Sequence, residues 1–171
     1  MNRILIAGIG NIFLGDDAFG VEVVRELPHH TLPSEVRVVD FGIRGYDLAY
    51  ALADDYDAAI LVDATPRGEA PGTLYLIEPD LSELGRLDHA SVDAHSLGPV
   101  RVLQMAEALG GHPARLYLIG CEPGELNSAD GYVGLSEAVQ AAVPKAVEMI
   151  ESLVKDLVHS ETPVAAGVES A

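Results

Sequence analysis

The sequence predicts an α/β fold, a three-layer sandwich around a mostly parallel twisted sheet of about five strands with one antiparallel strand. Short apolar runs of strand length alternate with segments whose apolar residues recur at helical spacing. The run between Asp57 and Asp63 is continuously apolar, which is typical of a central parallel strand covered on both faces. The run Thr73–Glu78 follows too soon for a helical crossover, so we expect a hairpin-like return and an antiparallel strand.

The first half of the chain predicts two units of strand and helix. Ile4–Ala7 is apolar and short enough for a buried strand, and the apolar residues at 21, 23, 24 and 27 then follow one helix face. Pro28 ends this helix because proline has no backbone N–H to donate. Val36–Asp40 predicts the next strand, and Tyr46–Leu52 predicts a short helix whose leucines point inward.

The second half predicts two longer helices on either side of the last strand. Leu97–Leu109 has a helical pattern that ends at two glycines, and Arg115–Gly120 is typical of a buried strand. Leu135–Val158 carries a long apolar stripe and predicts the longest helix. Pro144 inside that helix costs about 3 kcal/mol unless it marks a kink or a restart. Residues 79–96 are predicted to form a long functional loop.

Length and composition indicate one domain, which we expect to span residues 1–158, followed by a disordered tail over 159–171. The formal charge of −17, from 27 acidic against 10 basic residues, argues against nucleic acid or an anionic membrane as a partner. The single cysteine, Cys121, excludes an internal disulfide framework, and no signal peptide or membrane span is visible. A cytoplasmic location is therefore expected.

The glycine-rich loop after the first strand ends in two adjacent carboxylates, Asp16 and Asp17. Gly10 and Asn11 favour a tight turn there, whereas helix capping explains one acid more readily than two. The two glycines before Asn11 form half of a dinucleotide-binding motif. However, Phe13 stands where the third glycine should be, and the carboxylates would oppose a pyrophosphate. We expect no nucleotide, because two carboxylates favour a cation or a proton-transfer role.

Three candidate ligands converge if the sheet is parallel, since ligands bind beyond the carboxyl ends of the strands. Asp17 follows the first strand, Asp63 ends the third, and His95 precedes a predicted helix. Two carboxylates and one imidazole can hold a divalent transition metal and leave positions open for water or substrate. Taken singly, a histidine near a helix start is usually structural and an aspartate at a strand end is usually a turn or cap residue.

Other catalytic motifs are absent from the sequence. It contains neither the His-Glu-x-x-His pattern of zinc peptidases nor the Gly-x-Ser-x-Gly elbow of serine hydrolases. Cys121 follows an apolar strand, so we expect a buried and unreactive thiol.

Four motifs form an ordered set along about residues 2–155. They are Gly8-x-Gly10-Asn11-x-x-x-Gly15-Asp16-Asp17-x-x-Gly20, Asp63-Ala64, Pro71-Gly72-Thr73 and Asp93-Ala94-His95-Ser96-Leu97-Gly98. This set resembles the hydrogenase maturation endopeptidases, which remove the C-terminal extension from the large subunit of nickel–iron hydrogenases. The resemblance implies a protease whose partner is the large-subunit precursor.

The resemblance also implies that Asp17, Asp63 and His95 contact a metal ion, with Asp16 as their neighbour at the site. A carboxylate so placed is a candidate acceptor for the proton of an attacking water. The divalent metal would be nickel already seated in the precursor, so the free protein need not hold a metal of its own. Two alternatives remain open: a nucleotide- or cofactor-binding α/β enzyme that uses the same cleft, and a nickel-sensing chaperone that binds the precursor without cutting it.

The segment after the second strand departs from the family pattern. Many members have Asp-Gly-Gly-Thr there, whereas this chain has Asp40-Phe41-Gly42-Ile43-Arg44-Gly45 and keeps only Asp40 and Gly42. Together with Gly10 and Asn11, these two residues are expected to line the substrate cleft. The departure leaves open which hydrogenase is processed.

Overall fold

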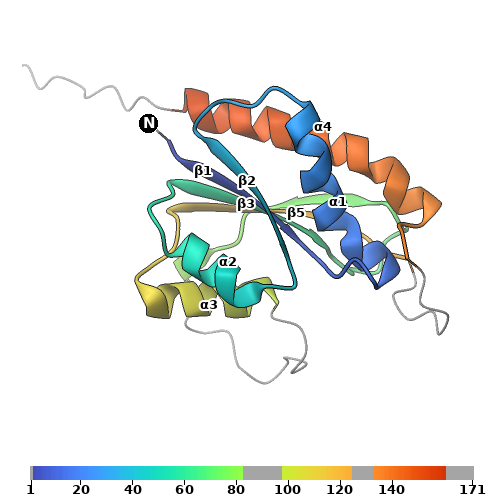
Figure 1. Ribbon diagram of the computed structural model, residues 1–171, viewed down its shortest axis with the longest axis horizontal. Helices are drawn as coiled ribbons and strands as arrows, with labels where there is room; N and C mark the ends of the chain where they lie inside the picture. Colours follow the sequence, from blue (N-terminus) through green and yellow to red (C-terminus); the bar gives the residue numbers. More distant parts are fainter. Residues whose placement is uncertain (1, 83–97, 125–132, 161–171) are drawn as a thin grey trace, which may run out of the picture.

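A five-stranded sheet lies between two layers of helices (Figure 1). The structure is a computed structural model that describes residues 2–82, 98–124 and 133–160. Its strands are β1 (Ile4–Ile9), β2 (Val36–Gly42), β3 (Ala58–Ala64), β4 (Leu74–Ile77) and β5 (Arg115–Cys121). Its helices are α1 (Phe19–Glu26), α2 (Gly45–Leu52), α3 (Pro99–Leu109) and α4 (Glu137–His159), with short 3-10 helices η1 (Gly15–Ala18) and η2 (Leu27–His29).

The sheet has the order β2-β1-β3-β5-β4. β1 pairs in parallel with β2 and β3, and β3 pairs in parallel with β5. β4 is antiparallel to β5, which confirms the predicted orientation. It forms no hairpin with β3, however, because β5 lies between them. The predicted mostly parallel sheet with one antiparallel strand is confirmed.

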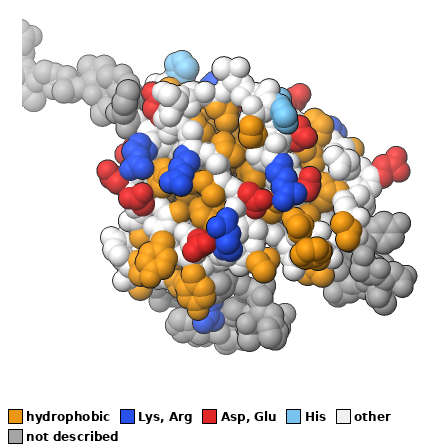
Figure 2. Space-filling view, viewed as in Figure 1, with side chains coloured by type: hydrophobic (Ala, Val, Ile, Leu, Met, Phe, Trp, Pro, Cys, Tyr) orange, Lys and Arg blue, Asp and Glu red, His pale blue; other side chains and the backbone are white. Residues whose placement is uncertain are grey.

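The helices cover the two faces of the sheet in pairs, with α1 and α4 on one face and α2 and α3 on the other (Figure 1). On the face drawn in Figure 2, acidic and basic side chains are intermixed, and hydrophobic atoms reach the surface between them. The net charge of −17 therefore does not appear there as a patch of one sign. Within the described residues, no helix is long and apolar enough to cross a membrane.

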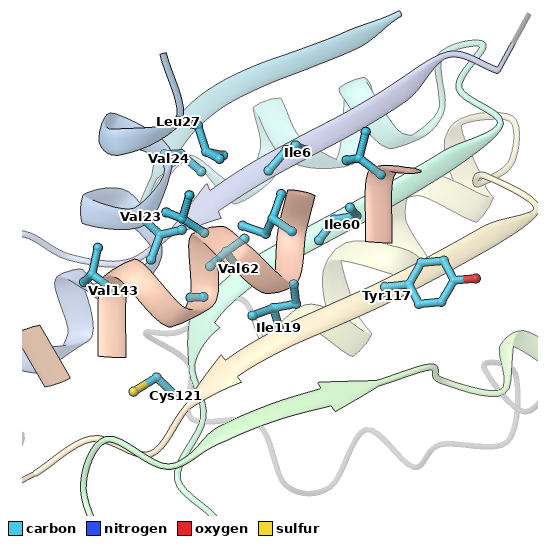
Figure 3. Close-up of a cluster of buried hydrophobic side chains, with 14 of the residues drawn as sticks. Ile6, Val23, Val24, Leu27, Ile60, Val62, Tyr117, Ile119, Cys121 and Val143 are labelled. Carbon is cyan, nitrogen blue, oxygen red and sulfur yellow. The ribbon is translucent and has the colours of Figure 1, made fainter. Parts of the chain in front are cut away.

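Two hydrophobic cores form because successive residues of a buried strand point to opposite faces. Ile60 and Val62 of β3 pack with α1 and α4 in the core drawn in Figure 3. Ala59 and Leu61 of the same strand pack with α2 and α3. This double burial confirms that the continuously apolar run is a central strand, and it places Asp63 on the same face as Leu61.

The long C-terminal helix differs from the prediction at its proline. α4 runs without interruption from Glu137 to His159, although Pro144 lies inside it. Pro144 is on the exposed face, where water can reach the backbone carbonyl that loses its partner. The buried stripe on the other face offsets the cost of the proline; it consists of Val139, Ala142, Val143, Ala146, Val147, Ile150, Val154 and Leu157.

The connections diverge on either side of β1, because β2 lies on one side of it and β3 on the other. In open α/β sheets such a switch point is where ligands bind, beyond the carboxyl ends of the strands. The loops after β1, β2 and β3 therefore lie side by side, as the sequence predicted.

Candidate active site

Gly10 brings the β1 loop close to the loop after β2. Its φ is +147°, and a Cβ there would lie 1.9 Å from the carbonyl oxygen of Asp17, so only glycine fits. The Gly10 N–H donates to the carbonyl of Gly42 at 3.0 Å. Gly42 also needs a left-handed backbone, with φ +55°. The two glycines hold these loops together at the switch point.

Asp17 is half-buried and is held by its own loop. The backbone N–H of Asn11 donates to Oδ2 of Asp17 at 2.8 Å. The Asn11 side chain in turn accepts a bond from the N–H of Phe13 at 2.9 Å, which closes the turn. The sequence explains this geometry locally, because an asparagine turn followed by a short 3-10 helix brings the carboxylate back across the loop.

Asp63, the second predicted ligand, is half-buried near the end of β3. Burial, with a further contribution from the nearby charge of Asp17, raises the pKa of Asp63 to about 8, against an opposing effect of the Ala64 backbone. The two carboxylates are therefore close enough for one charge to affect the other. A carboxyl group that keeps its proton near neutral pH is typical of a functional site.

Asp16 has a different environment from its neighbour. It is 4% exposed, and its carboxylate accepts bonds from Gly124 N–H at 2.8 Å, Ser136 N–H at 2.7 Å and the Ser136 hydroxyl at 2.9 Å. Both oxygens are thus engaged with the segments before α4. The structure gives Asp16 a positioning role, and the role of proton acceptor stays a prediction.

Asp40 reaches the site edge from β2. Its carboxylate lies 3.5 Å from the guanidinium of Arg25 in α1, and its carbonyl accepts a bond from Arg44. The Asp40 side chain is 38% exposed. Its ion pair with Arg25 joins β2 to α1. Its predicted place in the substrate cleft stays a prediction.

His95, the third predicted ligand, lies outside the described residues. In the part of the chain that the structure describes, no three His, Cys, Asp or Glu side chains are arranged to hold a metal ion. Asp17 and Asp63 supply two oxygen donors, which fit a divalent cation that brings further ligands with it.

Glu122 was not identified from the sequence. It is only 5% exposed, and its carboxylate accepts bonds from the N–H groups of Arg67 and Gly68 and from the Tyr75 hydroxyl at 2.7 Å. The Tyr75 bond contributes most to lowering the pKa of Glu122. Glu122 thereby fixes the loop after Asp63. The only sequence signal was an acid directly after a buried strand.

Cys121 is fully buried at the end of β5. Burial raises the pKa of its thiol to about 11, so the thiolate needed for nucleophilic attack is absent near neutral pH. The predicted burial of the cysteine is confirmed, and its lack of reactivity stays a prediction that the raised pKa supports.

The chain is an α/β protein with the carboxylates Asp17 and Asp63 at one edge of its sheet, and comparison with known proteins specifies the family. Residues 21–153 match the family HycI, described as hydrogenase maturation protease. A putative hydrogenase maturation protease of Methanocaldococcus jannaschii is 39% identical over 153 residues, which cover 89% of this chain and 96% of the relative.

Solved structures agree with this match. A hydrogenase maturating endopeptidase HybD from Escherichia coli superposes with a TM-score of 0.76 at 31% identity, covering 90% of this chain and 93% of that one. A [NiFe] hydrogenase maturation protease HycI from Thermococcus kodakarensis gives a TM-score of 0.70 at 28% identity, with the same coverage of 90% and 93%. The chain belongs to the hydrogenase maturation protease family, and it is a hydrolase of the endopeptidase class.

Proposed function

We propose that this protein removes the C-terminal extension of a nickel-loaded [NiFe]-hydrogenase large-subunit precursor in the cytoplasm. The family and the names of its relatives support the reaction and the kind of substrate. The observation that carries the proposal is the placement of Asp17 and Asp63 together at the switch point of the sheet. Two adjacent carboxylates with one retained proton favour proton transfer or cation contact over phosphate binding.

Each residue of the site has a proposed part. Asp17, Asp63 and His95 contact the nickel of the substrate, and a divalent metal so placed supplies polarisation of a carbonyl or a water of lowered pKa. Asp17 is presented by the Asn11 N–H, and Asp63 holds a proton in the free protein. Asp16 fixes the loop that carries Asp17, while Gly10 and Gly42 hold the loops after β1 and β2 together beside it.

The proposal requires selectivity for the metal-loaded precursor. Because the site is completed by the metal of the substrate, the protein should ignore generic peptides and the nickel-free precursor. The test is incubation of the purified protein with precursor prepared with and without nickel, with the tail followed by mass spectrometry. We expect a discrete loss of mass in the nickel-loaded form alone.

Other results would point to other functions. Equal trimming of both precursor forms would indicate a metallopeptidase that carries its own ion. Stable binding of the nickel-loaded precursor with no loss of mass would instead indicate a chaperone that senses nickel. Neither result is compatible with the proposed reaction.

A further inference from the structure

A pocket of about 420 Å³ opens directly beside Asp63. The sheet forms its floor, and the start of α3 and the segment after β4 form its walls. Its lining residues are Leu61, Asp63, Ala64, Thr65, Pro66, Ile77, Pro79, Asp80, Pro99, Val100, Leu103, Leu116 and Leu118. The volume lies within the range of about 300–1,000 Å³ that is typical of small-molecule sites, so it has ample room for one large side chain.

The lining is almost entirely apolar. Its two carboxylates are Asp63 and Asp80, and Asp80 already accepts bonds from the Ser82 N–H at 2.9 Å and the Ser82 hydroxyl at 2.6 Å. Water occupies about 30 Å³ per molecule in the liquid, so water filling this space would find few hydrogen-bond partners on its walls. An apolar group that displaced this water would bind favourably.

The pocket is continuous with the candidate active site because Asp63 belongs to both. A peptide whose scissile bond lies at Asp17 and Asp63 advances only about 3.3–3.6 Å per residue when extended. The side chains next to that bond must therefore lie within reach of the pocket. The apolar walls of the pocket favour an aliphatic side chain, branched or unbranched, at this position of the peptide.

We infer that this pocket is a specificity subsite that binds one large apolar side chain of the precursor, from a residue flanking the scissile bond. This inference rests on the proposed function, since it names the part of the peptide that the same site selects. It assigns Val100, Leu103 and Leu118 the role of specificity determinants, and they need not touch the reacting atoms.

A pair of tryptophan substitutions on α3 tests the inference. Val100 lies at the pocket and is 42% exposed, whereas Leu109 lies at the far end of the same helix and is 44% exposed. Val100→Trp fills the pocket from its rim without disturbing the core, and Leu109→Trp is the matched control. Because the natural chain contains no tryptophan, the emission of each introduced indole shows whether it is buried or solvated.

The effect of Val100→Trp should depend on the size of the substrate side chain beside the scissile bond. With a precursor carrying leucine beside the scissile bond, Val100→Trp should lower kcat/KM at least tenfold, whereas Leu109→Trp should change it less than twofold. When that leucine is replaced by glycine, the wild type should lose activity and the Val100→Trp penalty should shrink. Equal effects of both tryptophans, or a penalty independent of the substrate side chain, would overturn the inference.

A binding experiment separates this inference from the proposed function. N-acetyl-leucinamide is titrated into the methyl-labelled protein and followed by NMR, with N-acetyl-glycinamide as the control ligand. We expect saturable shifts of the Val100, Leu103 and Leu118 methyl signals with the leucine compound alone, and their loss in Val100→Trp. If these shifts occur but no precursor is trimmed, the proposed function fails while the pocket stands. If the precursor is trimmed but neither compound shifts these signals, the subsite is wrong and the function stands.

Discussion

Asp63 places a carboxyl group in a half-buried position, and the desolvation of its charged form costs stability. Its pKa rises from 3.8 to about 8, mainly through burial and secondarily through Asp17. Between these values the folded state keeps a proton that the unfolded state releases, so stability falls as the pH rises from about 4 to about 8. A residue retained at such a cost is explained by function rather than by folding.

Replacing Asp63 with Asn should therefore stabilise the protein while it abolishes trimming. The amide has the shape of the protonated acid and needs no charge, so the gain should be near zero at pH 4 and rise to several kcal/mol, at most about 5 kcal/mol, at pH 8. Urea unfolding across this pH range measures the difference. Asp47→Asn, on the exposed part of α2, serves as the control and should leave the pH dependence unchanged. A stability difference of equal size at pH 4 and pH 8 would contradict the assignment.

Asp17→Asn should abolish activity while leaving stability nearly unchanged. The amide oxygen can still accept the Asn11 N–H, so the loop and its hydrogen bond survive and unfolding should change by less than about 1 kcal/mol. Trimming of the precursor should be lost, because a neutral ligand cannot replace the carboxylate charge. Circular dichroism melting and mass spectrometry measure the two effects. A large fall in melting temperature would show that Asp17 is a structural cap instead.

At the scale of elements, Asp16 joins η1 to the segments that surround the start of α4. Ser136, which precedes Glu137, contributes both its N–H and its hydroxyl to this carboxylate. A residue 120 positions away in the sequence thus helps to hold the loop that carries Asp17. Asp16 and Asp17 are neighbours in the chain, but Asp16 fixes the loop whereas Asp17 is the proposed metal contact.

Removing the Asp16 carboxylate should destabilise the fold more than removing one of its hydrogen-bond donors. Asp16→Ala leaves three part-buried donors without their acceptor, so we expect a loss of about 1–3 kcal/mol of unfolding free energy. Ser136→Ala removes only the hydroxyl bond and should cost about 0.5–1.5 kcal/mol. Denaturant titration of both variants measures the series. Equal losses in the two variants would mean that the backbone donors find water instead.

At the scale of the whole molecule, the excess of acidic residues affects the rate at which the protein encounters a charged partner. A net charge of −17 gives a field that acts over about 10 Å at 0.1 M salt and over about 3 Å at 1 M. This field would speed encounter with a basic patch on the precursor more than it would strengthen the final contact.

Salt should therefore slow cleavage mainly by slowing the encounter of the protein with its precursor. Raising the ionic strength from about 0.05 M to about 0.5 M should lower kcat/KM severalfold and leave kcat at saturating precursor nearly constant. Steady-state trimming at several sodium chloride concentrations measures both, and the melting temperature at each concentration controls for stability. A rise of kcat/KM with salt would show that apolar contacts dominate the encounter.

The sequence alone determined the elements and the edge of the sheet where Asp17 and Asp63 lie. Apolar periodicity and glycine positions act within a few residues, so they can be recognised without the fold. Tertiary structure alone decided the rest: β5 between β3 and β4, the burial of Asp16 and Glu122, and the raised pKa of Asp63. These properties depend on partners distant in sequence, because hydrogen-bond acceptance and desolvation are set by whatever packs around a side chain rather than by its neighbours in the chain.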